Sequence, residues 1–252
     1  MGVIAIIPAR YASTRFPGKL LANQTGKYLI QHVYEQVSRA KLLKSVLIAV
    51  DDERIGRACD QFTAAWRMTR TDHPTGTDRI AEVAEELSAE IIVNVQGDEP
   101  EIDPANIDRL IELLSNDEKA DMATLAALFR PGEDVNNPNI VKVVLDQQGR
   151  ALYFSRYPIP YRRGGDKENT PVVYRKHLGV YAYRRKVLLQ LSQMPPTPLE
   201  RAEKLEQLRA LENGLIIAVA EVQHESVGID TTQQYDDFVH RFQQKTTADD
   251  CG

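Results

Sequence analysis

Short apolar runs alternate with amphipathic helical patterns along the first half of the chain, and this alternation constrains the fold most strongly. Three runs are typical of strands buried on both faces of a sheet: the continuously apolar run 3–7 and the mainly apolar runs 45–50 and 91–95. Three stretches between and after them carry apolar residues at helical spacing: 28–40, 77–87 and 103–114. The alternation predicts an α/β fold with a mostly parallel central sheet flanked by helices. Asp51 and Asp52 are expected to cap a helix that directly follows the run at 45–50.

The pattern changes after about residue 120. Three β-like runs follow, at 121–128, 140–146 and 151–155, and QQGR between the last two predicts a hairpin turn. The remaining predicted elements are a strand at 177–183, helices at 184–192 and 199–213, a strand at 216–222 and a closing helix at 231–244. We therefore expect a single α/β domain over 1–245, with a β-rich excursion over about 120–183 and a disordered tail at 246–252.

The composition argues against several classes of protein. The net charge of -5 disfavours a nucleic-acid partner. Cys59 and Cys251 form no CxxC pair, which argues against a disulfide scaffold or a zinc site and fits a reducing compartment. No apolar run is long enough to cross a membrane, and the N-terminus lacks the features of a signal peptide. We expect a cytoplasmic protein without a membrane partner.

Three cations gather in the loop after the first predicted strand, in the sequence IIPARYASTRFPGK: Arg10, Arg15 and Lys19. Ligands of an open parallel sheet bind beyond the carboxyl ends of its strands, so this position favours a bound polyphosphate. The spacing of the glycines matches neither the GxxxxGK[ST] nor the GxGxxG phosphate-binding motif. An ordinary solvated basic loop therefore stays an alternative.

Two carboxylates also follow predicted strands. Asp98 lies in NVQGDEP, where it fits the preference of Mg²⁺ for carboxylates combined with substrate phosphates, although a plain turn explains it too. Asp230 lies in VGIDTT, and its simplest interpretation is the N-cap of the closing helix. The two residues form a metal site only if the fold brings them together.

Two further segments carry polar side chains with chemical potential. In TRTDHPTGTDR (69–79), small hydroxyl residues and a glycine suit the approach of a base or ribose, or else simply cap a helix at Thr77 or Asp78. Arg156, Arg163 and His177 suit an acidic, hydroxyl-rich substrate. These patterns indicate phosphate, metal and an anionic polar substrate, and they leave the reaction open.

Taken together, these segments resemble one family. IIPARYASTRFPGK, NVQGDEP, ALYFSR, KHLGVYAY, LEQLRALENG and the late GID are similar, in this order, to the 3-deoxy-manno-octulosonate (Kdo) cytidylyltransferases. The resemblance implies a nucleotide-diphospho-sugar transferase-like fold, usually a homodimer. It implies that CTP and Kdo react to CMP-Kdo and pyrophosphate, with Mg²⁺, for lipopolysaccharide biosynthesis. Another acidic sugar (8-amino-Kdo or sialic acid) and a non-catalytic sugar-nucleotide-binding protein are the alternatives.

The resemblance also implies roles for individual residues. The catalytic residues would be Arg10, Lys19, Asp98 and Asp230, with the two aspartates as metal ligands. The CTP-binding residues would be Arg10, Arg15, Lys19, Arg70, Thr75, Gly76 and Thr77. The sugar-binding residues would be Gln96, Arg156, Arg163, His177, Glu206 and Gln207. The chain departs from the family pattern at Leu20 and Tyr28, where proline is usual, and at 62–64, where a glycine pair is common.

Overall fold

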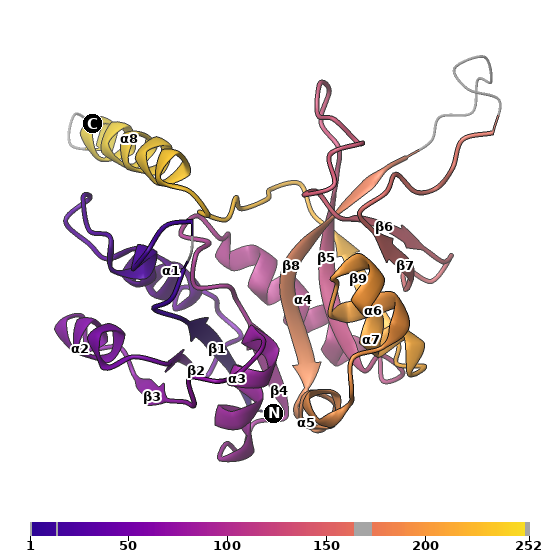
Figure 1. Ribbon diagram of the computed structural model, residues 1–252, viewed down its shortest axis with the longest axis horizontal. Coiled ribbons are helices and arrows are strands. Elements are labelled where there is room, and N and C mark those ends of the chain that lie inside the picture. The colour runs from indigo at the N-terminus through magenta and orange to yellow at the C-terminus, as the bar shows by residue number, and fades with distance from the viewer. Residues whose placement is uncertain (1, 14, 164–172, 250–252) are drawn as a thin grey trace. The chain divides into compact units, whose positions relative to one another are not determined.

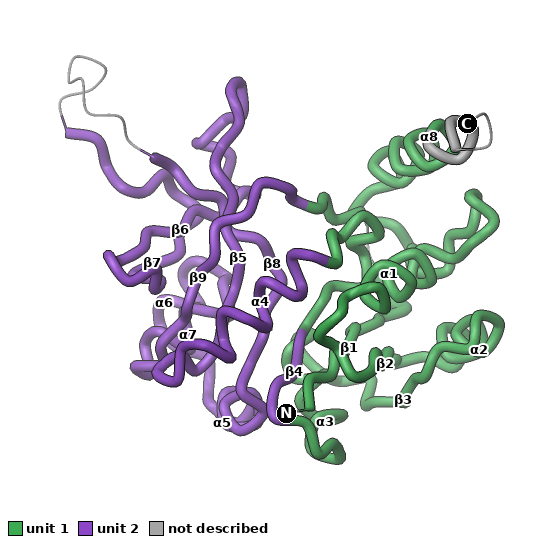
Figure 2. Tube along the Cα trace, turned by 180° about the vertical axis from the view of Figure 1, so that it is seen from behind, with its two compact units in different colours: residues 1–89, 94–104, 226–252 green, residues 90–93, 105–225 purple. Residues whose placement is uncertain are grey.

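The computed structural model describes residues 2–13, 15–163 and 173–249 (Figure 1). The chain forms two compact units (Figure 2). Unit 1 comprises residues 1–89, 94–104 and 226–252, and unit 2 comprises residues 90–93 and 105–225. The chain therefore passes from one unit to the other several times. The single domain expected over 1–245 stays a prediction.

Unit 1 contains the parallel strands that the sequence predicted. β1 (Val3–Ala9) pairs with β2 (Ser45–Val50), and β2 pairs with β3 (Trp66–Met68), all in parallel. The sequence pattern missed β3 because this strand is three residues long and mostly exposed. The helices of this unit are α1 (Leu29–Val37), α2 (Glu53–Gln61), α3 (Gly76–Glu85) and α8 (Thr232–Asp249), with a short 3-10 helix η1 (Lys19–Leu21).

One predicted helix cap in unit 1 is confirmed in part, and another is wrong. Asp52 alone caps α2, since its carboxylate accepts a hydrogen bond from the Arg54 amide. Helix α3 is capped by Thr75, not by Thr77 or Asp78: the Thr75 hydroxyl accepts from the Asp78 amide at 3.1 Å. Helix α3 therefore starts before the residues that the sequence favoured, whereas α2 starts at one of the two predicted caps. The carboxylate of Asp51 is consequently available for another role.

The backbone conformation helps to explain why the chain tolerates other residues where the family pattern has proline or glycine. Tyr28 precedes α1 with φ −64, which is the value that a proline ring would fix. Thr63 adopts φ 57, in the left-handed region that favours glycine. Leu20 lies in η1 and is buried. Tyr28 and Thr63 therefore keep the backbone shape that proline or glycine would favour.

Unit 2 contains a mixed set of strands. β5 (Met122–Leu128) pairs antiparallel with β8 (Arg175–Arg184) and parallel with β9 (Ile217–Glu221). β6 (Lys142–Leu145) and β7 (Ala151–Ser155) form the predicted antiparallel hairpin. β4 (Ile91–Asn94), α4 (Pro104–Asn116) and α5 (Arg185–Gln193) also match predicted elements. The predicted α/β class and β-rich excursion are confirmed.

One predicted helix in unit 2 is wrong. The stretch 199–213 forms two short helices, α6 (Pro198–Glu203) and α7 (Gln207–Glu212). Lys204 ends α6 in the left-handed conformation, with φ 54. The apolar periodicity continues across this break, so it gave no sign of the turn. At the end of the chain, α8 runs to Asp249 and is longer than predicted; residues 250–252 of the expected tail lie outside the described residues.

Helix α8 packs on α1 through a buried histidine. His32 of α1 lies edge-on to the rings of Phe238 and Phe242 of α8, at centroid distances of 5.1 and 4.8 Å. Its side chain accepts or donates a hydrogen bond with the Thr25 hydroxyl at 2.7 Å. Burial lowers the pKa of His32 to about 4. The packing of α8 therefore requires a neutral histidine.

This histidine predicts an acid-sensitive stability. The pKa of His32 in the folded state lies below the unfolded value of about 6.5. The stabilisation that neutral His32 gives to the folded state is therefore fully present above pH 6.5 and is lost as the pH falls to about 4. We expect wild-type unfolding free energy to fall by up to about 1.4 kcal/mol per pH unit from this group. His32→Gln should flatten this slope in urea melts, whereas His240→Gln, at an exposed α8 histidine, should not. Equal slopes for all three proteins would contradict the assignment.

Among the described residues, no helix has the length and apolar character needed to span a membrane.

Candidate active site

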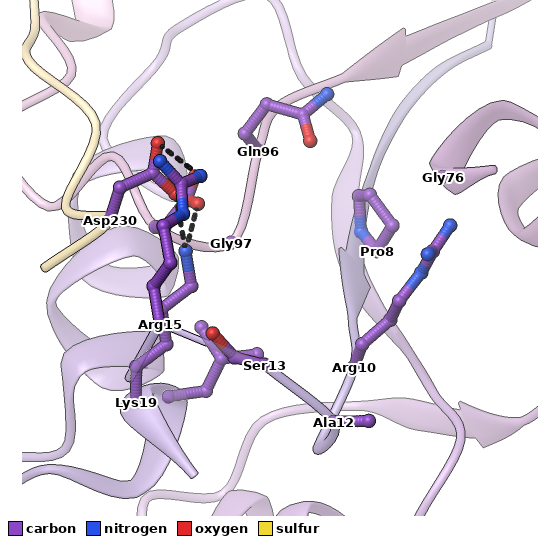
Figure 3. A pocket seen from close by; sticks show the side chains of 12 residues that line it. Pro8, Arg10, Ala12, Ser13, Arg15, Lys19, Gly76, Gln96, Gly97 and Asp230 are labelled. Atoms are coloured by element: carbon purple, nitrogen blue, oxygen red, sulfur yellow. Dashed lines mark hydrogen bonds and ion pairs between the residues drawn. The ribbon is translucent and has the colours of Figure 1, made fainter. Parts of the chain in front are cut away.

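A pocket of about 390 Å³ opens in unit 1 beyond the carboxyl end of β1 (Figure 3). Its volume lies in the range of small-ligand sites. It is lined by Pro8, Arg10, Ala12, Ser13, Arg15, Lys19, Leu20, Gly76, Gln96, Gly97, Asp98 and Asp230. Four separate stretches of the sequence thus supply the lining. The three cations of the opening loop all belong to it, as the sequence predicted for a ligand site.

The ammonium group of Lys19 joins the two predicted metal carboxylates. Its Nζ donates to Asp98 Oδ2 at 2.5 Å, to Asp230 Oδ1 at 3.2 Å and to the Ile229 carbonyl at 2.9 Å. The Lys19 side chain is only 12% exposed, so this contact is poorly screened by water. The fold therefore brings Asp98 and Asp230 to one point, which was the condition for reading them as a site.

The backbone explains why Asp230 is available for this contact. Thr231, not Asp230, caps α8: its hydroxyl accepts from the Gln234 amide at 3.2 Å, and Gln234 Oε1 accepts from the Thr231 amide at 3.0 Å. This is a capping box with glutamine at the third helical position. The Ile229 amide also donates to the Asp98 carbonyl at 2.8 Å. The interpretation of Asp230 as the N-cap is therefore wrong.

The two arginines of the opening loop lie on different sides of the pocket. Arg15 pairs with Asp230 at 3.0 Å, but both side chains are largely open to water, so the pair contributes little to stability. Arg10 points away from this cluster, toward Pro8 and Gly76 (Figure 3). Its guanidinium donates to the Pro74 carbonyl at 3.1 Å. Cationic groups therefore face the pocket from two directions, as an extended phosphate chain requires.

Gly97 allows the segment that carries Asp98 to lie against β1. A Cβ at this position would lie 2.9 Å from the Pro8 carbonyl oxygen and 3.3 Å from Ile30 Cδ1. Only glycine fits such a close approach of two backbones. The glycine in NVQGDEP therefore sets the distance between Asp98 and the opening loop.

We expect Gly97→Ala to displace this segment and to lower both stability and turnover. The clash is with backbone, so the expected cost is about 1–3 kcal/mol of unfolding free energy. Thermal unfolding and a pyrophosphate-release assay measure the two effects. Gly26→Ala is a control for glycine substitution in this unit, because nothing lies within 4 Å of a Cβ there, although its φ of +85 adds strain. Unchanged turnover of Gly97→Ala would contradict this role.

The residues predicted near the nucleotide base divide into two groups. Gly76 lines the pocket at the start of α3, and Thr75 caps that helix. Arg70 and Thr77 are not among the lining residues. Arg70 is exposed and pairs with Asp72 at 3.5 Å. The contacts of these two residues with CTP stay predictions.

The donor set at Lys19 fits a divalent cation. No group of three or more histidine, cysteine, aspartate or glutamate side chains in the described residues could hold a metal. Asp98 and Asp230 supply two carboxylates that already share one positive charge. Mg²⁺ typically takes one or two carboxylates and completes its octahedron with water and substrate phosphates. The pair is therefore sufficient for Mg²⁺ held jointly with a nucleotide.

Five of the six predicted sugar-binding residues lie in unit 2, and Gln96 lines the pocket of unit 1. Arg156 uses its guanidinium on three carbonyls: Glu203 at 2.7 Å, Pro138 at 3.0 Å and Lys204 at 3.3 Å. Arg163 is exposed. Arg156 is therefore built into the fold of unit 2, whereas Arg163 lies at its surface.

His177 of β8 contacts one hydroxyl group and two aromatic rings in unit 2. His177 Nε2 lies 3.0 Å from the Thr124 hydroxyl, and its ring packs against Phe154 and Tyr181. Burial lowers the pKa of His177 to about 3, so the ring is neutral near pH 7.

Glu206 precedes α7, and Gln207 is buried with no hydrogen-bond partner for its Nε2. An orphaned amide beside the start of α7 suits a polar ligand.

Sequence reasoning missed several residues of the pocket region. Pro8, Ala12 and Ser13 line it mainly through the course of the backbone, which no side-chain pattern signals. Glu99 accepts a hydrogen bond from the Ser226 hydroxyl, and burial raises its pKa to about 7. This contact ties the segment after β4 to the segment before α8. The adjacent acidic pair in NVQGDEP was the only available hint.

Known proteins resemble the chain over nearly its whole length. The model of a family described as cytidylyltransferase matches residues 4–225. The 3-deoxy-manno-octulosonate cytidylyltransferase of Geobacter sulfurreducens is 53% identical over 92% of this chain and 95% of that protein, and that of Pelobacter propionicus is 54% identical over 92% and 93%. A solved CMP:2-keto-3-deoxy-manno-octonic acid synthetase complexed with CTP is 41% identical, with a TM-score of 0.92, covering 97% of this chain and 100% of that one.

Proposed function

Since the chain belongs to the 3-deoxy-manno-octulosonate cytidylyltransferase family, we propose that it activates Kdo with CTP, giving CMP-Kdo and pyrophosphate for lipopolysaccharide biosynthesis. The observation that carries this proposal is the convergence of Lys19, Asp98 and Asp230 in a pocket faced by two further arginines. Three cationic and two anionic side chains line it, which suits a nucleotide triphosphate with one divalent ion.

The reaction is a displacement at the α-phosphorus of CTP. The anomeric 2-hydroxyl oxygen of Kdo forms a bond to that phosphorus, the bond to the bridging oxygen of pyrophosphate breaks, and the hydroxyl proton leaves to solvent. Catalysis of this kind rests on positioning and charge stabilisation more than on covalent chemistry. Arg10 and Lys19 would stabilise the charge on the phosphoryl oxygens. The Arg15 side chain is 65% exposed, compared with 12% for Lys19, and it would bind the phosphate chain.

Mg²⁺ is the metal that we propose for this site. Asp98 and Asp230 would hold it, because they are the carboxylates that meet in the pocket. The bound ion would neutralise phosphate charge and favour ionisation of the attacking hydroxyl. Lys19 would then have the phosphates as its partners in place of the two carboxylates.

The acidic sugar would be recognised by the polar residues of unit 2 that the sequence pattern assigned to it. Arg163 is the better candidate for the sugar carboxylate, because Arg156 already donates to three carbonyls. His177, held neutral, suits a hydrogen bond with a sugar hydroxyl. Glu206 and Gln207 would contact further hydroxyls. These assignments rest on the family pattern and on the orphaned amide of Gln207.

We also propose a cytoplasmic homodimer. Leu152, Tyr157 and Tyr161 leave 61%, 75% and 85% of their surface exposed around β7, which supports a contact between copies. Leu152→Asp with Tyr157→Asp should shift the mass measured by light scattering from two chains to one. The buried, reduced Cys59 is compatible with the cytoplasm. A wild-type mass of one chain at micromolar concentration would contradict the dimer.

A substrate panel tests the proposed function. The pure protein is incubated with CTP, Mg²⁺ and, separately, Kdo, 8-amino-Kdo or sialic acid, and pyrophosphate and the CMP-sugar are measured. We expect rapid release with Kdo and much slower release with sialic acid. Preferred turnover of another sugar acid would change the substrate. Binding of CTP without pyrophosphate release from any sugar acid would favour the non-catalytic alternative.

A further inference from the structure

A fully buried arginine of unit 1 has no role in the chemistry described above. Arg79 of α3 is 0% exposed. Its guanidinium donates to the Thr69 hydroxyl, to the Arg70 carbonyl at 3.1 Å and to Asp51 Oδ2 at 3.3 Å. Burial of a charged group costs free energy unless partners compensate it, so its retention here calls for an explanation.

The partner carboxylate, Asp51, holds the backbone on both sides of Arg10. Its Oδ1 accepts a hydrogen bond from the Tyr11 amide at 2.8 Å. Its own amide donates to the Ala9 carbonyl at 3.3 Å. Asp51 is 10% exposed in its side chain, so both contacts are shielded from water. The backbone at Arg10 is therefore fixed by one residue that follows β2.

The guanidinium of Arg10 contacts a loop that Arg79 holds in place. The Arg10 guanidinium donates to the Pro74 carbonyl, in the loop between β3 and α3. Arg79 anchors the beginning of that loop at Thr69 and Arg70. Thr69 is itself tied to β2, because its hydroxyl donates to the Val50 carbonyl at 2.8 Å. Both ends of Arg10 are thus connected to the Asp51–Arg79 pair.

We propose that Asp51 and Arg79 are positioning residues that hold Arg10 in the orientation that binds the CTP phosphates. The proposal rests on the proposed function of the pocket. Neither residue lines the pocket, so each would act through Arg10 and the loop 69–75. Proximity of the two arginines supports this coupling, since the charge of Arg10 is among the groups that lower the pKa of Arg79, after burial.

A double-mutant cycle distinguishes positioning from a purely structural ion pair. Arg79→Lys and Asp51→Asn are made in the wild-type chain and in the Arg10→Ala chain, and CTP affinity is measured by calorimetry with Mg²⁺. Misplacement of a binding group can cost up to about 10²-fold, and we expect about 10-fold weaker CTP binding in the wild-type background. In the Arg10→Ala background the same substitutions should change affinity by less than about 2-fold.

One control and the second test variant keep the result interpretable. Arg184→Lys removes a comparable arginine of unit 2, which donates to the Ala120, Leu114 and Asp117 carbonyls, and should lower thermal stability without changing CTP affinity. Asp51→Asn keeps an acceptor for the Tyr11 amide and serves if Arg79→Lys does not fold. The KM for Kdo should stay within about 2-fold in the folded variants.

The possible failures are separate. Equal losses of CTP affinity in the two backgrounds would overturn the positioning role while leaving the proposed function intact. Unchanged affinity in the wild-type background would overturn it as well. Absence of CTP binding by the wild-type protein would overturn the proposed function itself. Because CTP affinity is measured without Kdo, the double-mutant cycle can still be interpreted if the protein does not turn over Kdo.

Discussion

Asp98→Asn is expected to abolish pyrophosphate release in a protein that remains folded. Asparagine keeps the shape of the side chain but removes one of the two negative charges that meet at Lys19. Loss of a metal carboxylate should lower kcat by at least about 10³-fold, which corresponds to about 4 kcal/mol of barrier. Asp230→Asn should behave in the same way. A continuous pyrophosphate assay at saturating CTP and Kdo measures the effect.

The matched control is Asp237→Asn, at an exposed aspartate of α8 in the same unit. It should retain wild-type turnover, and all three variants should show similar circular dichroism. Calorimetric titration with Mg²⁺ in the presence of CTP gives a second readout, in which Asp98→Asn should lose metal affinity. Near-normal turnover by either pocket variant would rule out the metal role of that aspartate.

Lys19→Met should lower kcat by at least about 10²-fold, or about 2.7 kcal/mol of barrier. Methionine has a similar length but no charge, so the variant loses stabilisation of the phosphoryl oxygens. It also leaves Asp98 and Asp230 side by side without their shared ammonium group. The like charges should then repel each other in the absence of a cation.

The control for this substitution is Lys27→Met, which removes an accessible lysine that pairs with Glu35 at 2.7 Å. Its turnover should be that of the wild type. Steady-state kinetics over a range of CTP concentrations separate two roles of Lys19. A rise in KM for CTP with unchanged kcat would mean that Lys19 serves ground-state binding alone, against the catalytic role proposed here.

The sequence predicted the pocket best where chemistry coincides with the end of a strand. Lys19 and its neighbours follow β1, and Asp98 follows β4, so the parallel-strand rule placed them at a ligand position. The role of Asp230 was harder to predict, because the sequence VGIDTT fits a helix cap at this residue equally well. The capping box of Thr231 and Gln234 excludes the cap, and the contact with Lys19, which joins segments far apart in the chain, brings Asp230 into the pocket.

Other features depend on which of several possible hydrogen-bond partners a side chain takes in the fold, and the sequence pattern does not contain this information. Asp51 and Asp52 are chemically equivalent as caps, and the fold uses one for α2 and the other for Tyr11 and Arg79. The break at Lys204 leaves the apolar periodicity of 199–213 intact. Arg156 looks like a ligand group by composition, yet carbonyls of unit 2 occupy its donors. Tertiary hydrogen bonds decide each of these cases.

The ammonium group of Lys19 acts as a counterion for Asp98 and Asp230. A metal–nucleotide complex that bound in the pocket would replace these ion pairs with others, so only the difference in electrostatic energy would favour binding. By thermodynamic reciprocity, phosphates that drew Lys19 away would strengthen the affinity of the carboxylates for a cation, and the cation would strengthen nucleotide binding by the same factor. Nucleotide and metal should therefore bind with positive cooperativity, and free metal alone should bind weakly.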